Sequence, residues 1–202
     1  MVITDPVVLK GRDAVAVCRA AAQGGATIIQ VRWKDGAPAE VLELTRALVA
    51  ALPVPVLVND RADIALAAGA AGAHLGWDDP PLEALRPHLP AGFLLGLSVG
   101  SPDEAARAAA TTADYWSIGP CFATPSKPDA GPPLGPAGFA GLARLAPEGI
   151  PVIGIGGIAP SNARSIIEAG AAGIAVIGAV LDAVDPEGAA RELRSVADLV
   201  DG

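Results

Sequence analysis

Residues 115–129 read YWSIGPCFATPSKPD, a short apolar run followed by a polar, proline-rich segment. The first four residues are mostly aromatic or β-branched, which is typical of a buried strand. The segment that follows cannot be helical, because its prolines lack the backbone N–H and clash with the preceding turn. The stretch therefore predicts a strand that ends in a stiff loop.

The loop carries three hydrogen-bond donors close together. Thr124 and Ser126 contribute hydroxyls and Lys127 contributes an ammonium group, while the intervening Pro125 restricts the backbone. Donors grouped in this way suit a cluster of anionic oxygens. A surface loop with turn-forming residues and a solvated lysine is the alternative interpretation.

Outward from this stretch, short aliphatic runs alternate with alanine-rich amphipathic segments along the whole chain, the pattern of a parallel sheet covered by helices. Eight such pairs predict an α/β protein with a single (β/α)8 TIM barrel over residues 1–202. Weakly repeated segments, AGAAG at 68–72 and at 169–173, agree with closure. We expect strands at 2–4, 27–31, 54–58, 72–75, 93–97, 115–118, 152–155 and 173–177, and helices at 13–23, 38–51, 62–68, 81–87, 102–110, 136–146, 160–169 and 186–200.

The composition excludes several classes of protein. Hydrophobic residues make up 51% of the 202 residues, enough for a sizeable core, but only 3% are aromatic, so aliphatic side chains must fill it. A net charge of −8 without a basic run argues against a nucleic-acid partner. Two cysteines are too few for a disulfide framework, and every apolar run is too short for a membrane span. We expect a cytoplasmic protein with reduced thiols.

In a TIM barrel the loops after the strands carry the chemistry, so polar residues at strand ends are the candidates for a site. After the second expected strand, Gln30, Arg32 and Lys34 share one face, because side chains alternate along an extended segment. Two cations on one face favour an anionic ligand; a solvated strand end is the alternative. Ser98 stands at the end of the fifth strand, where it could touch a substrate or start a turn.

Carboxylates follow the third and fourth expected strands. Asp60 and Asp79 could meet on adjacent loops and hold Mg²⁺, which needs one or two carboxylates when phosphate oxygens and water complete its shell. Alternatively, Asp60 pairs with Arg61 or caps a helix, and Asp79 caps the helix after Pro80. His74, inside an aliphatic strand, is interpreted as a hydrogen-bonded core histidine.

Glycines end the seventh and eighth expected strands. The segment GIGGI at 154–158 and Gly178 would let backbone N–H groups approach a phosphate, which barrels commonly bind at these two loops. The same glycines loosely match a dinucleotide-binding fingerprint. Only one strand and one helix remain downstream, too few for a Rossmann unit.

Taken in order, six motifs over nearly the whole chain resemble the thiamine-phosphate synthase family, in the group shared with thiazole tautomerases. The motifs are QxRxKD at 30–35, NDRxD at 59–63, HLGxxD at 74–79, GxS at 96–98, GPxFxTxxK at 119–127 and GxGGI at 154–158. The resemblance implies a Mg²⁺-dependent transferase that joins 4-amino-2-methyl-5-hydroxymethylpyrimidine diphosphate to a thiazole phosphate, giving thiamine phosphate and pyrophosphate. Its partners would be these small molecules, without nucleic acid or membrane; homo-oligomer formation stays open.

The resemblance also implies roles for individual residues. Catalysis would rest on Arg32, Lys34, Lys127 and Ser98. The pyrimidine diphosphate would contact Gln30, Arg32, Lys34, Asn59 and Ser98, with Mg²⁺ on Asp60 and Asp79. Lys127 would hold the departing pyrophosphate, Thr124 and Ser126 would line the junction with the thiazole, and Gly157, Ile177 and Gly178 would cradle its phosphate.

Four positions depart from the family pattern, and three other functions compete. Trp33 and Trp77 occupy variable or usually polar places beside the motifs, Gly100 stands where many relatives carry histidine, and Gly178 where a phosphate-binding serine is common. A phosphate-binding isomerase barrel would need a carboxylate or lysine base within a strand, and none is well placed. A thiazole tautomerase would use a histidine in the loop after the sixth strand, and none occurs there. A non-catalytic barrel that binds a phosphorylated metabolite would bind ligand without turnover.

Overall fold

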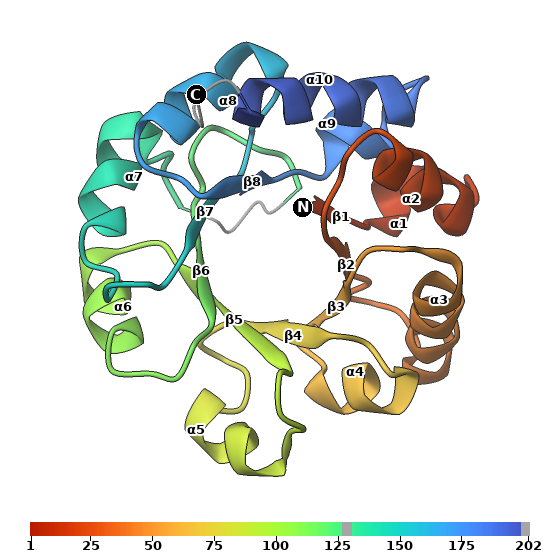
Figure 1. Cartoon of the computed structure of the whole chain (residues 1–202), viewed down its shortest axis with the longest axis horizontal. Helices are drawn as coiled ribbons and strands as arrows, with labels where there is room; N and C mark the ends of the chain where they lie inside the picture. Colours follow the sequence, from red (N-terminus) through yellow and green to blue (C-terminus); the bar gives the residue numbers. More distant parts are fainter. Residues whose placement is uncertain (127–130, 199–202) are drawn as a thin grey trace.

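The computed structural model describes residues 1–126 and 131–198 and forms a ring of parallel strands surrounded by helices (Figure 1). The predicted (β/α)8 barrel is confirmed, because the sheet has eight strands in sequence order. The strands are β1 (Val2–Ile3), β2 (Ile29–Val31), β3 (Val56–Asn59), β4 (Gly72–Leu75), β5 (Leu94–Val99), β6 (Tyr115–Ile118), β7 (Val152–Ile155) and β8 (Gly173–Ala175).

The ring closes between its first and last strands. Val2 forms a parallel bridge with Val176, just after β8. The Ile3 amide donates to the Val176 carbonyl over 2.9 Å, and the Val176 amide donates to the carbonyl of Met1 over 3.1 Å. Neither β1 nor β8 therefore presents an open sheet edge.

Helices cover the outer face of the ring (Figure 1). They are α1 (Pro6–Leu9), α2 (Ala14–Gln23), α3 (Pro38–Ala51), α4 (Ala62–Ala68), α5 (Leu82–Leu85), the 3₁₀ turn η1 (Arg86–His88), α6 (Pro102–Ala108), α7 (Gly135–Ala143), α8 (Pro160–Glu168), α9 (Gly178–Leu181) and α10 (Pro186–Asp198).

Local sequence explains where several helices begin. The Asp13 carboxylate accepts the amides of Val15 and Ala16 over 2.8 and 3.2 Å, which caps α2. Proline stands at the first turn of α3, α6 and α8, where its missing N–H removes no intrahelical bond. The apolar outward side chains of the strands and the inward faces of these helices form the core, in which Trp116 and Phe139 are almost fully buried.

The structure corrects the predicted boundaries in a few places. The eighth strand ends at Ala175 instead of residue 177, and the helix expected at 81–87 divides between Leu85 and Arg86 into α5 and η1, which contains Pro87 in its first turn. Two four-residue helices, α1 and α9, were not predicted, because each is too short for a helical hydrophobic pattern. Both lie in loops after strands, at the end of the barrel where the polar residues gather.

Two expectations about composition can be compared with the described residues. Cys18 and Cys121 are free and buried. Among the described residues, no helix combines the length and apolar character needed to cross a membrane.

Candidate active site

A cavity of about 740 Å³ opens at the carboxyl ends of the strands. This volume lies within the range of pockets that enclose small molecules. The cavity brings together all the predicted site residues that the structure describes; Lys127 lies outside the described residues. Those lining it are Gln30, Arg32, Lys34, Asn59, Asp60, Asp79, Ser98, Thr124, Ser126, Gly157, Ile177 and Gly178.

A chain of hydrogen bonds crosses the wall of the cavity. His74 on β4 contacts the Tyr115 hydroxyl through Nδ1 over 2.9 Å and the Ser98 hydroxyl through Nε2 over 3.0 Å. Gln30 on β2 is hydrogen-bonded to Tyr115, although burial is the larger influence on that phenol and raises its pKa. Tyr115 therefore stays neutral and able to donate. The interpretation of His74 as a hydrogen-bonded core residue is correct, but the residue also lines the cavity.

Gly96 makes room for this chain of hydrogen bonds. A Cβ atom at position 96 would overlap the ring of Tyr115. The Tyr115 ring also lies against His74, with ring centroids 5.5 Å apart. Gly96 thus permits the position of Tyr115, and Tyr115 in turn orients the imidazole.

Side chains after Ile29 alternate between the cavity and the core, as expected from the sequence. Gln30 and Arg32 line the cavity, whereas Val31 between them is fully buried in the core. Lys34 is exposed at the rim. An amide and two cations therefore share the cavity, as the period of an extended chain predicts.

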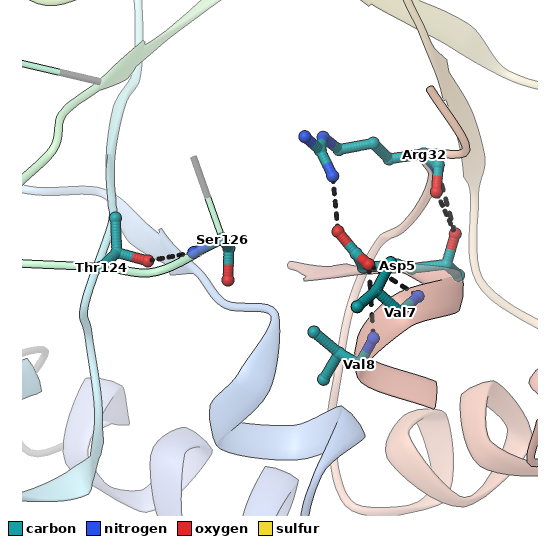
Figure 2. A network of polar contacts seen from close by, with 7 residues as sticks. Asp5, Val7, Val8, Arg32, Thr124 and Ser126 are labelled. Carbon is teal, nitrogen blue, oxygen red and sulfur yellow. Dashed lines mark hydrogen bonds and ion pairs between the residues drawn. The ribbon is translucent and has the colours of Figure 1, made fainter. Parts of the chain in front are cut away.

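Arg32 is held from the loop after β1, as Figure 2 shows. Its Nη1 donates to the Asp5 carboxylate over 2.6 Å, with both side chains largely buried at 15% and 11% exposure. Asp5 also accepts the amides of Val7 and Val8 over 3.0 and 3.3 Å, so it caps α1. The Arg32 amide donates to the Thr4 hydroxyl over 3.0 Å.

Asp60 and Asp79 meet at the mouth of the barrel. Burial, followed by the charge and hydrogen bond of Asp79, raises the pKa of Asp60 to about 6; Lys34 and Arg32 act in the opposite direction. Asp60 adopts a left-handed conformation with φ of 64°, which directs the chain out of β3. Asp79 accepts the Gly76 amide over 2.7 Å. Arg61 pairs with Asp63 instead of Asp60.

The chemistry of this pair fits a hard divalent cation. Two adjacent carboxylates repel each other when both are ionised, and a cation between them removes that repulsion. Within the described residues, no group of three or more acidic, histidine or cysteine side chains could hold a metal. Two carboxylates suit Mg²⁺, which keeps water and takes substrate phosphate oxygens in the rest of its shell.

The loop after β6 is fastened to the loop after β7. Cys121 and Phe122 donate their amides to the carbonyls of Ile155 and Gly156 over 2.7 and 2.9 Å. Gly157 has a φ of 63°, and a Cβ atom there would overlap the Ala123 carbonyl and Phe122. These two loops form one packed unit that ends in Thr124 and Ser126, where the Ser126 amide donates to the Thr124 hydroxyl over 3.3 Å.

Gly178 begins α9 beside Ile177, and both residues line the cavity together with Gly157. A Cβ atom at position 178 would meet no atom within 4 Å, so the backbone here faces open space. Within the described part of the chain, no acceptor is paired with the Gly178 amide. This amide can donate to an anion without the serine side chain that the family pattern favours.

Sequence reasoning missed Asp5 and Tyr115 as residues of the site. Asp5 precedes Pro6 directly after β1, and an Asp-Pro pair at a strand end is a recognisable helix start. Tyr115 lies two residues before Ser117, which also lines the cavity, so the period of two along β6 could have assigned it inward. Gly100, in place of the family's histidine, donates its amide to Glu104 over 2.6 Å.

Comparisons with known proteins show the family to which this chain belongs. The family model described as thiamine monophosphate synthase matches residues 1–180. A thiamine-phosphate synthase from Roseiflexus castenholzii is 45% identical over 199 residues, covering 97% of this chain and 86% of that protein. The thiamine-phosphate synthase of Moorella thermoacetica is 46% identical over 189 residues, covering 92% of this chain and 89% of that protein.

Solved structures extend the comparison to three dimensions. Thiamine phosphate pyrophosphorylase from Pyrococcus furiosus superposes with a TM-score of 0.88 at 37% identity, covering 100% of this chain and 96% of that one. An orotidine 5′-phosphate decarboxylase from Pyrococcus horikoshii, with a TM-score of 0.72 at 16% identity and full coverage of both chains, shares the fold alone. The family match over residues 1–180, together with the two relatives near 45% identity, places this chain in the thiamine monophosphate synthase family.

Proposed function

We propose that this enzyme joins 4-amino-2-methyl-5-hydroxymethylpyrimidine diphosphate to a thiazole phosphate and releases pyrophosphate. The observation that carries the proposal is that one cavity is lined by cations, a carboxylate pair and glycine-rich loops. Two anionic substrates can then occupy one space with their reacting ends adjacent.

The diphosphate would lie against Arg32, Lys34 and Asn59, with Lys127 beside the leaving pyrophosphate. The bond between the methylene carbon and the diphosphate oxygen breaks, and its electron pair leaves with the pyrophosphate. The amino-substituted pyrimidine ring donates electron density to the methylene cation that results. Positive side chains stabilise the charge that develops on the leaving group, which is where such groups lower a barrier most.

Asp60 and Asp79 would hold Mg²⁺, which when bound supplies positive charge to the diphosphate oxygens. Without it, the two carboxylates stand close to the same oxygens and repel them, so the metal and the substrate should bind together. The sequence resemblance and the proximity of the two carboxyl groups support this part of the proposal.

The pyrimidine would occupy the wall of the cavity, where Gln30 and Ser98 can bond its ring nitrogens and amino group. The thiazole phosphate would be bound by amides near Gly157, Ile177 and Gly178, with Thr124 and Ser126 along the path between the rings. The thiazole nitrogen then attacks the methylene cation and forms the new carbon–nitrogen bond. Since no strong base is needed, holding the two rings face to face is most of the remaining work.

We also propose that residues 1–202 act as one barrel, that both substrates reach it from the cytoplasm, and that it binds neither nucleic acid nor membranes. Neither the tautomerase function nor the non-catalytic function is favoured, because the relatives found are named as synthases. The tautomerase would also use a histidine in the loop after β6, whereas the two histidines of the sequence lie elsewhere, His74 on β4 and His88 in η1.

The direct test is an assay of the purified protein with both substrates and Mg²⁺. Thiamine phosphate is converted to fluorescent thiochrome and quantified. Product that disappears when EDTA removes the metal supports the proposal. Absence of product from folded protein that still binds pyrophosphate would reject it, and the same preparation would then be tested for thiazole isomerisation.

A further inference from the structure

We propose that Asp5 is a positioning residue that holds the Arg32 guanidinium ready for the diphosphate. This inference rests on the proposed function, which assigns Arg32 to that group. The chemistry is a charge-assisted hydrogen bond between a carboxylate fixed at a helix start and the arginine that would bind substrate.

Asp5 is itself immobilised by its role in α1. One of its oxygens accepts the amides of Val7 and Val8, and the other accepts Nη1 of Arg32. The carboxylate therefore cannot rotate toward Arg32 or away from it without releasing the helix cap. With only 7% of Asp5 exposed, water competes weakly for these bonds.

Arg32, the partner of Asp5, is held at its backbone as well as at its guanidinium. Thr4, next to Asp5, accepts the Arg32 amide over 3.0 Å, and its hydroxyl lies 3.3 Å from the Arg32 carbonyl. Backbone and side chain of Arg32 are thus held by two consecutive residues of the same loop. An arginine fixed in this way loses little conformational entropy when an anion binds.

The ion pair leaves most of the guanidinium available. A guanidinium has five N–H donors, and within the described residues its one side-chain acceptor is Asp5 through Nη1. Figure 2 shows the Arg32 side chain extending over the Asp5 carboxylate, with the guanidinium at the end that faces the side of Thr124 and Ser126. Asp5 also supplies a negative charge beside Arg32, which offsets its repulsion with Lys34 before substrate arrives.

The test variant is Asp5→Asn, which keeps a good helix cap but removes the charge and places an amide against the guanidinium. Dissociation constants for inorganic pyrophosphate with Mg²⁺ are measured by calorimetry, and kcat and KM are measured with both substrates. We expect the pyrophosphate Kd and the KM for the pyrimidine diphosphate to rise on the order of tenfold, near the value of one charge-assisted hydrogen bond.

The matched control is Asp13→Asn. Asp13 caps α2 through the same two amide contacts, but it is exposed and no arginine pairs with it in the described structure. Its variant should bind pyrophosphate like the wild type. If Asp5→Asn does not fold, Asp5→Ser takes its place, because serine also caps a helix and is neutral.

A double-mutant cycle with Arg32→Met separates positioning from a general structural effect. If Asp5 acts through Arg32, then Asp5→Asn weakens pyrophosphate binding in the wild-type background and has no further effect in Arg32→Met. An equal loss in both backgrounds overturns the proposal. So does unchanged binding by Asp5→Asn, or a wild-type protein that does not bind pyrophosphate.

The binding experiments need no turnover, so the two proposals can fail separately. Absence of thiamine phosphate with normal, Asp5-dependent pyrophosphate binding would reject the synthase function and leave the positioning role intact. Thiamine phosphate formation with an unchanged Asp5→Asn variant would reject only the positioning role.

Discussion

At the scale of single residues, the site gathers charged side chains in one cavity, the cation Arg32 and the carboxyl groups of Asp60 and Asp79. Arg32 has its carboxylate partner on one side and open cavity on the other, whereas Asp60 faces Asp79. Without a ligand, two neighbouring carboxylates such as Asp60 and Asp79 repel each other, and burial raises the free energy of each ionised group further. The arrangement is explained by a ligand that brings both phosphate and a cation.

Replacing Arg32 should lower activity, and it should also cost some stability, because it leaves the largely buried Asp5 carboxylate without its ion-pair partner. We expect Arg32→Met to reduce kcat/KM by roughly 100-fold, the usual cost of one donor to a developing charge. Steady-state rates and circular dichroism measure the two effects. The control is Arg164→Met, which breaks an exposed ion pair of 3.6 Å on α8. Near-normal kcat/KM in a folded Arg32→Met protein would reject the role of Arg32.

Asp60→Asn should stabilise the metal-free protein at neutral pH. Asparagine tolerates the left-handed conformation. Because folding raises the pKa of Asp60 from 3.8 to about 6, the wild type loses stability as the pH rises through this interval and the carboxyl ionises in the fold. The variant escapes that loss, so its advantage in stability is present above about pH 6 and absent below 3.8, the ordinary pKa of an aspartate. Because Asp60 is half-exposed and solvent screens its charge, the gain in the free energy of unfolding should be on the order of 1 kcal/mol.

Thermal unfolding in EDTA at several pH values measures this difference. Asp63→Asn is the control, and it should lower the stability at neutral pH instead of raising it. The reason is that the hydrogen bond from Arg61 favours the ionised carboxylate and lowers the pKa of Asp63. Addition of Mg²⁺ and pyrophosphate should stabilise the wild type more than Asp60→Asn. A variant that is less stable than the wild type at pH 7.5 without metal would contradict the electrostatic argument.

At the scale of elements, neighbouring strands position each other's side chains. The ring of Tyr115 on β6 occupies the space above Gly96 on β5, and Gly96 in turn pairs with His74 of β4 in the sheet register. Three consecutive strands thus fix one imidazole. The period of two along a single strand identifies which residues point inward, but it does not identify these contacts across strands.

Gly96→Ala should displace Tyr115 and break its hydrogen bond to His74. We expect a loss of stability of about 1–3 kcal/mol from overpacking and a higher KM for the pyrimidine diphosphate. Denaturant unfolding and steady-state kinetics measure the two effects. Gly141→Ala on α7 is the control, because its Cβ atom would meet nothing within 4 Å. Unchanged kinetics in Gly96→Ala would mean that Tyr115 does not order the site.

At the scale of the whole molecule, the two ends of the chain complete one cavity. The closing contact joins Val2 to Val176, and the loops beyond these residues carry Asp5 and Gly178. Figure 1 shows the first and last strands side by side in the ring. In the proposed function the pyrimidine diphosphate lies against Arg32, which Asp5 holds, and the thiazole phosphate lies against Gly178. The two substrates together would therefore connect the first and the last parts of the barrel.

Any ligand that binds in the cavity should stabilise the entire fold, because it binds the folded state and not the unfolded chain. At 100 times its Kd, Mg²⁺ with pyrophosphate should add about 2.7 kcal/mol. For a chain of this size that corresponds to an increase in Tm on the order of 5–10 °C. Scanning calorimetry with and without EDTA measures it, and Mg²⁺ with sulfate at equal ionic strength is the control. An equal Tm with Mg²⁺ and pyrophosphate and with Mg²⁺ and sulfate would show that the cavity does not recognise pyrophosphate.

The amino-acid sequence by itself determined the order of strands and helices, the barrel, the family and the group of polar residues at its mouth. These are local or periodic properties: aliphatic runs of four residues such as 152–155, capped helix starts such as Ser101, and motifs such as GxGGI. Only the tertiary structure decided that Asp5 holds Arg32, that Tyr115 lies over Gly96 and that Asp60 meets Asp79. Each of these pairs joins different strands or loops, so its geometry depends on the curvature and register of the closed sheet, which no local pattern in the chain encodes.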